Sequence, residues 1–181
     1  MGPPAKVAEQ TPTSSARKML TVPGGPVVCG EETFRALHVI RRANLLPALY
    51  DEPIVMAHTS FAAMTDLMDE PPPWLNVFDD PPRTTLPPRC RRATASQGAA
   101  IRLALALPAS LVLLEEPIKE KVKLSFIKAE GTLSILVGAY RIGRLSAVRP
   151  MVKALQKLGH GHVLPAPEML EAMWKALEEL D

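Results

Sequence analysis

The chain has 181 residues, which suffices for one domain with a substantial hydrophobic core. Its 21 Lys and Arg against 19 Asp and Glu leave a net charge of +2, so binding to nucleic acid or a membrane surface would need a local patch. The two cysteines and the lack of a signal-like segment predict a cytoplasmic protein with free thiols. The apolar stretch 103–114 is too short to span a bilayer and is broken by Pro108, so we expect no membrane partner.

The first part of the chain divides into an arm and the start of an alternating pattern. Residues 1–26 are rich in Pro, Gly, Ser and Thr, which predicts a poorly packed N-terminal arm. Thr59 has the side chain of an N-cap, so we expect it to begin a helix that carries Met64. The elements predicted between the arm and this helix are a strand over 26–29, a helix over 31–43, a helical turn over 45–50 and a strand over 54–56.

A proline-rich segment interrupts this pattern. Seven prolines lie between residues 71 and 88. Proline removes a backbone donor and fixes φ, so we expect no regular structure there and treat 71–92 as an insertion into the domain. The side chains that would anchor it to the core or to a partner are Trp74, Leu75, Val77 and Phe78.

The densest cluster of arginines lies in and just after this segment. Its members are Arg83, Arg89, Arg91 and Arg92. Such a cluster can contact a phosphate backbone, and a solvated loop accounts for it equally well. The lysines between residues 119 and 123 are distant in sequence, so only the fold decides whether they join the cluster.

The second half of the chain predicts a buried strand between two helices. Residues 110–114 form the strand, which ends at Glu115; an apolar helix over 95–107 precedes it. Residues 121–128 are ambiguous, and the alternation of lysines with apolar side chains there is typical of a half-buried strand. Three more helices are predicted. The first begins at 131–133 and ends at Gly143, and the second begins with Ser146 as its N-cap and ends at Gly159. The last is an amphipathic helix from Pro167 through Leu180.

This alternation predicts a single α/β domain over 27–181 with a short, mainly parallel sheet. Sheets of this kind place their chemistry at the carboxyl ends of the strands, which is where Glu115 lies. A carboxylate of a functional site is one interpretation of Glu115, and a solvated strand end before Pro117 is the other.

Several runs of residues resemble the PIN-domain-like family, in a branch described as predicted nucleic-acid-binding proteins. The order of these runs is more specific than any one of them. They are Val27-Val28-Cys29, the run 42–50, Ile101 to Ala106, Leu111 to Glu116, Gly131 to Leu136, Gly143-Arg144-Leu145 and Val148-Arg149-Pro150.

The resemblance implies a three-layer α/β/α PIN-like fold. Active members of the family cleave phosphodiesters with a metal ion, typically in RNA, as do the toxins of toxin–antitoxin pairs. Mg²⁺ or Mn²⁺ takes oxygen ligands, so several carboxylates must converge beside the phosphate. The family places these acids after the first strand, at helix starts and after a later strand.

This chain departs from that pattern at most of the acidic positions. Cys29 replaces the acid after the first strand, and Gln97 and Ala99 replace acids at a helix start. Ala62-Ala63 stand in another acidic region, and only Glu115 keeps a carboxylate. Loss of the ligands themselves weakens a metal site severely, since losing even a group that only hydrogen-bonds to a ligand costs about 10–100-fold in metal affinity or activity.

The main hypothesis is therefore a PIN-like protein that has lost nuclease activity and acts through binding or assembly, with no catalytic residue and no cofactor expected. The candidates for a vestigial site are Glu115, Cys29, Gln97 and Thr132. Cys29 fits a small buried hydrophobe, because no His or Cys partner lies at metal-ligand spacing. Thr132 either touches a phosphate or, as we expect, caps the helix that begins at Leu133.

Two alternatives stay open. One is an active Mg²⁺- or Mn²⁺-dependent ribonuclease in which Glu115 recruits further acids as metal ligands. These acids are Glu31, Glu32, Asp66 and Glu116. The other alternative is a nucleic-acid-binding module that uses the arginine cluster. The partners that follow from these hypotheses are a second copy of the chain in a homodimer, RNA, and an antitoxin-like protein.

Overall fold

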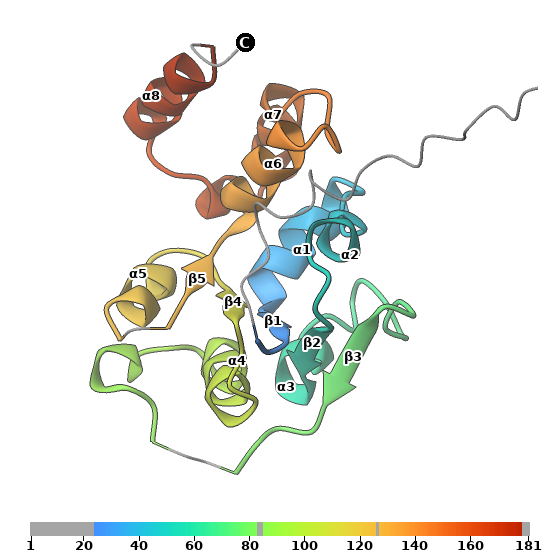
Figure 1. Cartoon of the computed structure of the whole chain (residues 1–181), viewed down its shortest axis with the longest axis vertical. Coiled ribbons are helices and arrows are strands. Elements are labelled where there is room, and N and C mark those ends of the chain that lie inside the picture. The colour runs from blue at the N-terminus through green and yellow to red at the C-terminus, as the bar shows by residue number, and fades with distance from the viewer. Residues whose placement is uncertain (1–23, 83–84, 126, 179–181) are drawn as a thin grey trace, which may run out of the picture.

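The computed structural model describes residues 24–82, 85–125 and 127–178. Within them, five parallel strands form one sheet in the order β3-β2-β1-β4-β5 (Figure 1). The strands are β1 (Val27–Cys29), β2 (Ile54–Ala57), β3 (Leu75–Phe78), β4 (Leu111–Leu113) and β5 (Ala129–Glu130). The predicted α/β class with a parallel sheet is confirmed.

The three central strands are apolar throughout because helices cover both faces of the sheet. β1, β2 and β4 are fully buried and rich in Val, Leu and Ile, as strands of a parallel sheet require. Successive side chains alternate between two hydrophobic clusters: Val27 and Cys29 join one, and Val28 joins the other. The sheet is therefore the middle layer of three.

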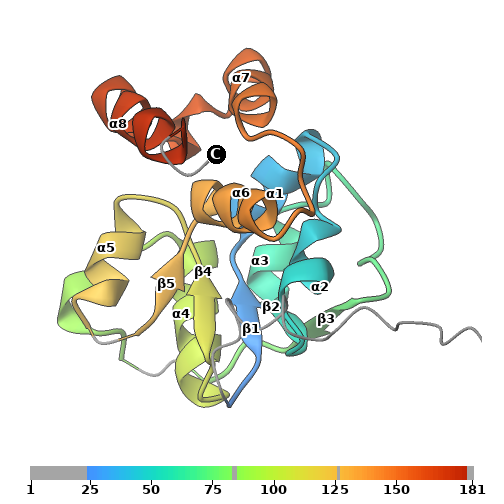
Figure 2. The same cartoon turned by 45° about the horizontal axis from the view of Figure 1, so that its top comes forward.

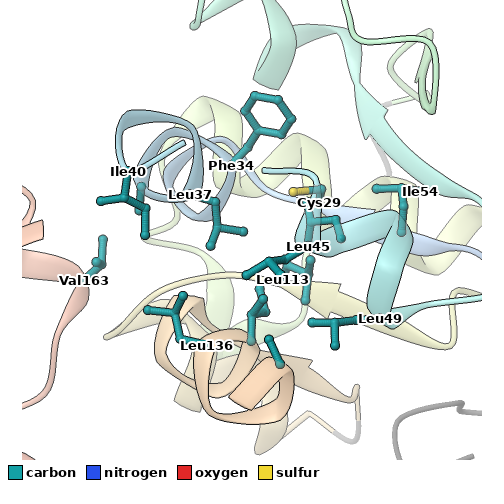
Figure 3. Close-up of a cluster of buried hydrophobic side chains, with 14 of the residues drawn as sticks. Cys29, Phe34, Leu37, Ile40, Leu45, Leu49, Ile54, Leu113, Leu136 and Val163 are labelled. Atoms are coloured by element: carbon teal, nitrogen blue, oxygen red, sulfur yellow. The ribbon is translucent and has the colours of Figure 1, made fainter. Parts of the chain in front are cut away.

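Helices form the outer layers. On one face, α1, α2 and α6 pack against the sheet, and α7 and α8 extend this cluster beyond α6; α4 and α5 cover the other face (Figure 2). Phe34, Leu37, Leu113 and Leu136 are at the centre of the larger cluster (Figure 3). The bounds are α1 (Glu31–Val39), α2 (Leu45–Leu49), α3 (His58–Ala62), η2 (Pro88–Cys90), α4 (Ala95–Ala106), α5 (Ile118–Lys123), α6 (Thr132–Arg141), α7 (Arg149–Lys157), η3 (Gly161–Val163) and α8 (Pro167–Glu178).

The prediction that the proline-rich segment has no regular structure is wrong at one place. Residues 75–78 form β3, which pairs with β2 at the edge of the sheet. The prolines flank this strand and do not interrupt it, and an edge strand tolerates nearby proline because one of its sides makes no ladder hydrogen bonds. Leu75 is buried in the main cluster, so this part of the supposed insertion belongs to the sheet.

The prediction of a strand over 121–128 is also wrong. Residues 118–123 form α5, and the strand begins only at Ala129. Ile118 and Val122 are four residues apart and both buried, which is helical spacing. Burial against the sheet thus outweighed the local alternation of lysines and apolar residues.

Two predicted helix caps are wrong, and two predicted stops are confirmed. The N-cap of α3 is Ala57; the backbone N–H and hydroxyl of Thr59 instead donate to the carboxylate of Asp80. Ser146 lies before α7, whose N-cap residue makes no side-chain cap. Gly143 and Gly159 have φ of 70° and 81°, the left-handed conformation that ends a helix.

The helix over 31–43 is shorter than predicted. α1 ends at Val39, and Arg41 has a φ of 56°, a left-handed conformation that stops the helix. The last helix begins at Pro167 as expected, whereas Leu180 lies outside the described residues. None of the described helices combines the length and apolar character that crossing a bilayer requires.

Candidate functional site

The strand order places the ends of β1 and β4 side by side at the centre of the sheet. β1 pairs with β2 on one side and with β4 on the other, so the connections after β1 and after β4 leave in opposite directions. Open parallel sheets bind ligands at this switch point, outside the carboxyl ends of the strands. Cys29 is in register with Leu113, so the start of α1 comes next to Glu115.

Glu115 is buried at this switch point, with only 2% of its surface exposed. Its Oε1 accepts hydrogen bonds from Thr33 Oγ1 at 2.7 Å, Thr132 N at 2.8 Å and Thr132 Oγ1 at 2.5 Å. Thr132 is the first residue of α6, whose N-cap Gly131 makes no side-chain hydrogen bond. The carboxylate therefore takes the place of a local N-cap for α6.

The prediction that Thr132 caps its helix is thus wrong in its details. The threonine donates both of its polar hydrogens toward Glu115 and accepts none from its own helix turn. Glu115 also connects α6 to α1, since Thr33 belongs to the first turn of α1. Both helix N-termini, which carry partial positive charge, thus lie next to one carboxylate.

The pKa of Glu115 is subject to opposing influences. Burial raises the pKa of this carboxyl above its ordinary value, while the hydrogen bonds from Thr132 and Thr33 and the nearby Lys119 lower it; burial is the largest influence. Gly131 leaves no spare room, because a Cβ there would lie 2.7 Å from Glu115 Oε2. Glu115 is accordingly packed as an internal hydrogen-bond acceptor.

We expect Glu115→Gln to gain stability relative to the native chain as pH rises. A carboxyl whose pKa is raised on folding contributes stability that is fully present below its unfolded pKa and is lost as pH rises through its folded pKa. Glutamine keeps an acceptor oxygen and does not ionise. The measurement is urea unfolding of both proteins from about pH 4 to pH 8; a stability difference that is constant over this range would contradict the prediction.

Cys29 is fully buried in the main hydrophobic cluster, as expected for a small core residue. Burial, together with the neighbouring Glu115, raises the pKa of its thiol far above the ordinary value. The thiolate is the reactive form of cysteine, so this thiol is not a nucleophile at neutral pH.

Gln97 lies in the first turn of α4, and its side chain has two partners. It closes a capping box with Thr94, and its Nε2 donates to Glu32 Oε2 at 3.3 Å. Glu32 follows β1, so this contact joins α4 to α1 at the carboxyl edge of the sheet. Gln97 therefore lies beside the switch point, where it caps the N-terminus of α4.

The other proposed metal ligands are paired with cations. Arg35 binds Glu31 at 3.3 Å and Asp66 at 2.7 Å, and Lys119 binds Glu116 at 3.1 Å. Arg35 is held further by the carbonyl of Ala63. The acids that the nuclease alternative would recruit are thus engaged elsewhere.

The described acids do not converge as a set of oxygen ligands for Mg²⁺ or Mn²⁺. In the part of the chain that the structure describes, no group of three or more His, Cys, Asp or Glu side chains could hold a metal ion. The rings of His160 and His162 lie 5.7 Å apart without such a third ligand. Mg²⁺ and Mn²⁺ need several converging oxygen ligands, and Oε1 of Glu115 already accepts three hydrogen bonds.

The arginine cluster lies on the protein surface. Arg89, Arg91 and Arg92 are exposed on and just after η2, whereas Arg83 lies outside the described residues. η2 packs against α5, which carries three lysines. The fold thus brings two cationic segments together, which we call the basic surface: Arg89, Arg91 and Arg92 on and after η2, and α5 with Lys119, Lys121 and Lys123.

Sequence reasoning missed Thr33, which is the residue that ties α1 to Glu115. No local pattern marks this threonine, because its partner is 82 residues away. Comparison of the chain with family models, with curated proteins and with solved structures finds no match. The family resemblance therefore rests on the sequence runs alone.

Proposed function

We propose that this chain is a PIN-like module without nuclease chemistry that acts through binding or assembly. The observation that carries this proposal is the internal use of Glu115, whose carboxylate joins the first turns of α1 and α6. A nuclease of the family's kind would need that carboxylate free to face a metal ion with others beside it. Here the acid stabilises the fold at the position where the family has a ligand.

The active ribonuclease remains the competing proposal, and metal titration separates the two. We expect no saturable Mn²⁺ binding by calorimetry, the same result for Glu115→Gln, and no Mn²⁺-dependent cleavage of a mixed pool of single-stranded RNA. Glu115→Gln is the appropriate variant because it keeps the acceptor for Thr33 and Thr132. Saturable binding in the native chain that disappears in Glu115→Gln would establish the nuclease alternative instead.

A second candidate function is binding of RNA through the basic surface. Two observations favour it: Arg89, Arg91 and Arg92 are all exposed, and the fold packs η2 against α5, which adds three lysines. A local basic patch supplies phosphate contacts even where the net charge is only +2. Cytoplasmic RNA is the natural partner of this proposal.

We expect the triple variant Arg89→Gln, Arg91→Gln, Arg92→Gln to bind single-stranded RNA at least about tenfold more weakly at low salt. Each phosphate contact contributes roughly −0.7 to the slope of log K against log salt, so the slope should fall in magnitude by about 2. Fluorescence anisotropy with a labelled 12-nucleotide RNA, repeated over a salt series, measures both quantities.

The matched control removes three cations from another part of the surface. Lys153, Lys157 and Lys175 are exposed on α7 and α8, so their replacement by Gln changes the net charge equally. An equal loss of affinity in both triple variants would mean that RNA responds only to total charge, and the basic surface would not be a binding site.

Assembly is the remaining route by which such a module acts, through a homodimer or an antitoxin-like protein. On α8, Leu170 and Leu177 are buried against the chain's own core, while Met169 is 64% exposed. Most of the apolar stripe of α8 is therefore already covered. Light scattering of the purified chain measures its mass directly and decides whether it dimerises.

A further inference from the structure

A cavity of about 420 Å³ lies between α6, α8 and the end of α2, away from the switch point. Its apolar wall is formed by Leu133, Val137 and Ile142 along α6 and by Met173 of α8. Gly138 also lines it and, having no side chain, leaves space in the middle of the wall. This volume is within the range of small-molecule sites, about 300–1,000 Å³.

None of the polar side chains that line this cavity forms a hydrogen bond or an ion pair with another described residue. They are Tyr50, Glu130, Ser134 and Arg141. Tyr50 is only 6% exposed, yet its hydroxyl makes no hydrogen bond to any described residue. The fully buried side-chain oxygens and nitrogens of the described residues all have partners except Glu52 Oε2, so the unpaired Tyr50 hydroxyl is open to the cavity, where a ligand can bond it.

Of the two charged side chains that line the cavity, the acid is the less exposed. Glu130, at the end of β5, is half-buried and makes no ion pair with another described residue, whereas Arg141 is exposed at the far end of α6. Burial raises the pKa of the Tyr50 hydroxyl, and the carboxylate of Glu130 raises it further. The phenol is therefore protonated at neutral pH and can both donate and accept.

We propose that this cavity binds a small apolar amine. The ammonium group pairs with Glu130 and donates to the Tyr50 hydroxyl, while the hydrocarbon part packs on Leu133, Val137 and Met173. Charge complementarity selects an amine, since the carboxylate of Glu130 is more enclosed than Arg141 and forms no ion pair with another described residue. The residues that line this cavity belong neither to the basic surface nor to the Glu115 site at the switch point.

Three probes of the same shape test the chemical class. Phenethylamine, 2-phenylethanol and 3-phenylpropanoate each carry one ring and differ in the polar group. Titrated into the ¹⁵N-labelled full chain, the amine should shift the backbone amides of Ser134, Val137 and Gly138 and bind at least about tenfold more tightly than the alcohol. If none of the probes shifts these amides, or if the propanoate binds best, the proposal is wrong.

Two variants connect the preference to its residue. Glu130→Gln should bring the affinity for the amine down to that for the alcohol, while Arg141→Gln should leave it unchanged or tighter. Both side chains are at least partly exposed, and unchanged amide positions elsewhere in the spectrum would verify the fold of each variant. An equal loss of affinity in the two variants would overturn the assignment of Glu130 as the partner of the amine.

Discussion

Replacing Glu115 by Ala should lower the free energy of unfolding by about 3–5 kcal/mol, because the change leaves buried donors without an acceptor. Thr132 N–H, Thr132 hydroxyl and Thr33 hydroxyl all donate to one carboxylate oxygen. Each donor left unsatisfied costs about 1–3 kcal/mol, less where the hydroxyls find other partners. Urea unfolding at pH 7 measures the loss.

Glu115→Gln is the matched control for this prediction. It keeps an oxygen where the three donors converge, so its stability should lie within about 1 kcal/mol of the native chain. This pair of variants separates a structural acceptor from a metal ligand, because only the latter role requires the negative charge. If Glu115→Ala were as stable as Glu115→Gln, the role of Glu115 as the cap of α6 would be refuted.

Replacing Gly30 by Ala should cost about 3 kcal/mol by forcing β1 and β4 apart. A Cβ at this position would lie 2.6 Å from the carbonyl oxygen of Leu113 and 2.9 Å from Leu114 Cδ2. The same carbonyl accepts a 2.9 Å hydrogen bond from Gly30 N–H. Gly30 has a φ of −80°, so its backbone conformation suits alanine and the contact alone causes the loss.

Gly161→Ala provides the comparison for Gly30→Ala. Apart from Gly161 and its chain neighbours, no atom of the described residues lies within 4 Å of a Cβ built there, so this variant should stay within about 0.5 kcal/mol of the native chain. Thermal unfolding of both variants under one set of conditions is sufficient. Equal stability of Gly30→Ala and Gly161→Ala would mean that the close approach of β1 and β4 is not a constraint on the fold.

The strand β4 and the position of Glu115 at its carboxyl end could be predicted from local patterns. The run of apolar residues before Glu115 is too short for a helix and lies between two helical segments, which is the pattern of a buried parallel strand. The glycine stops at Gly143 and Gly159 were equally accessible, because a left-handed residue after a helix favours glycine.

β3 and α5 could not be predicted correctly because long-range packing decided them. Prolines on both sides of β3 argue against a strand, but pairing with β2 and burial of Leu75 stabilise one. In α5 the local alternation favours a strand, but two side chains at helical spacing bury themselves against the sheet layer. Local propensity is a weak prior, and tertiary contacts override it.

The α/β class, the approximate order of strands and helices, and the place of the acid at a strand end follow from local patterns in the chain. What that acid does depends on the packing of the layers, since Thr33 and Thr132 reach Glu115 from two different helices. The same packing lets Arg35 form ion pairs with both Glu31 and Asp66, and it places η2, with its arginines, against α5. Contacts between residues far apart in sequence depend on how the layers pack, and no local periodicity encodes them.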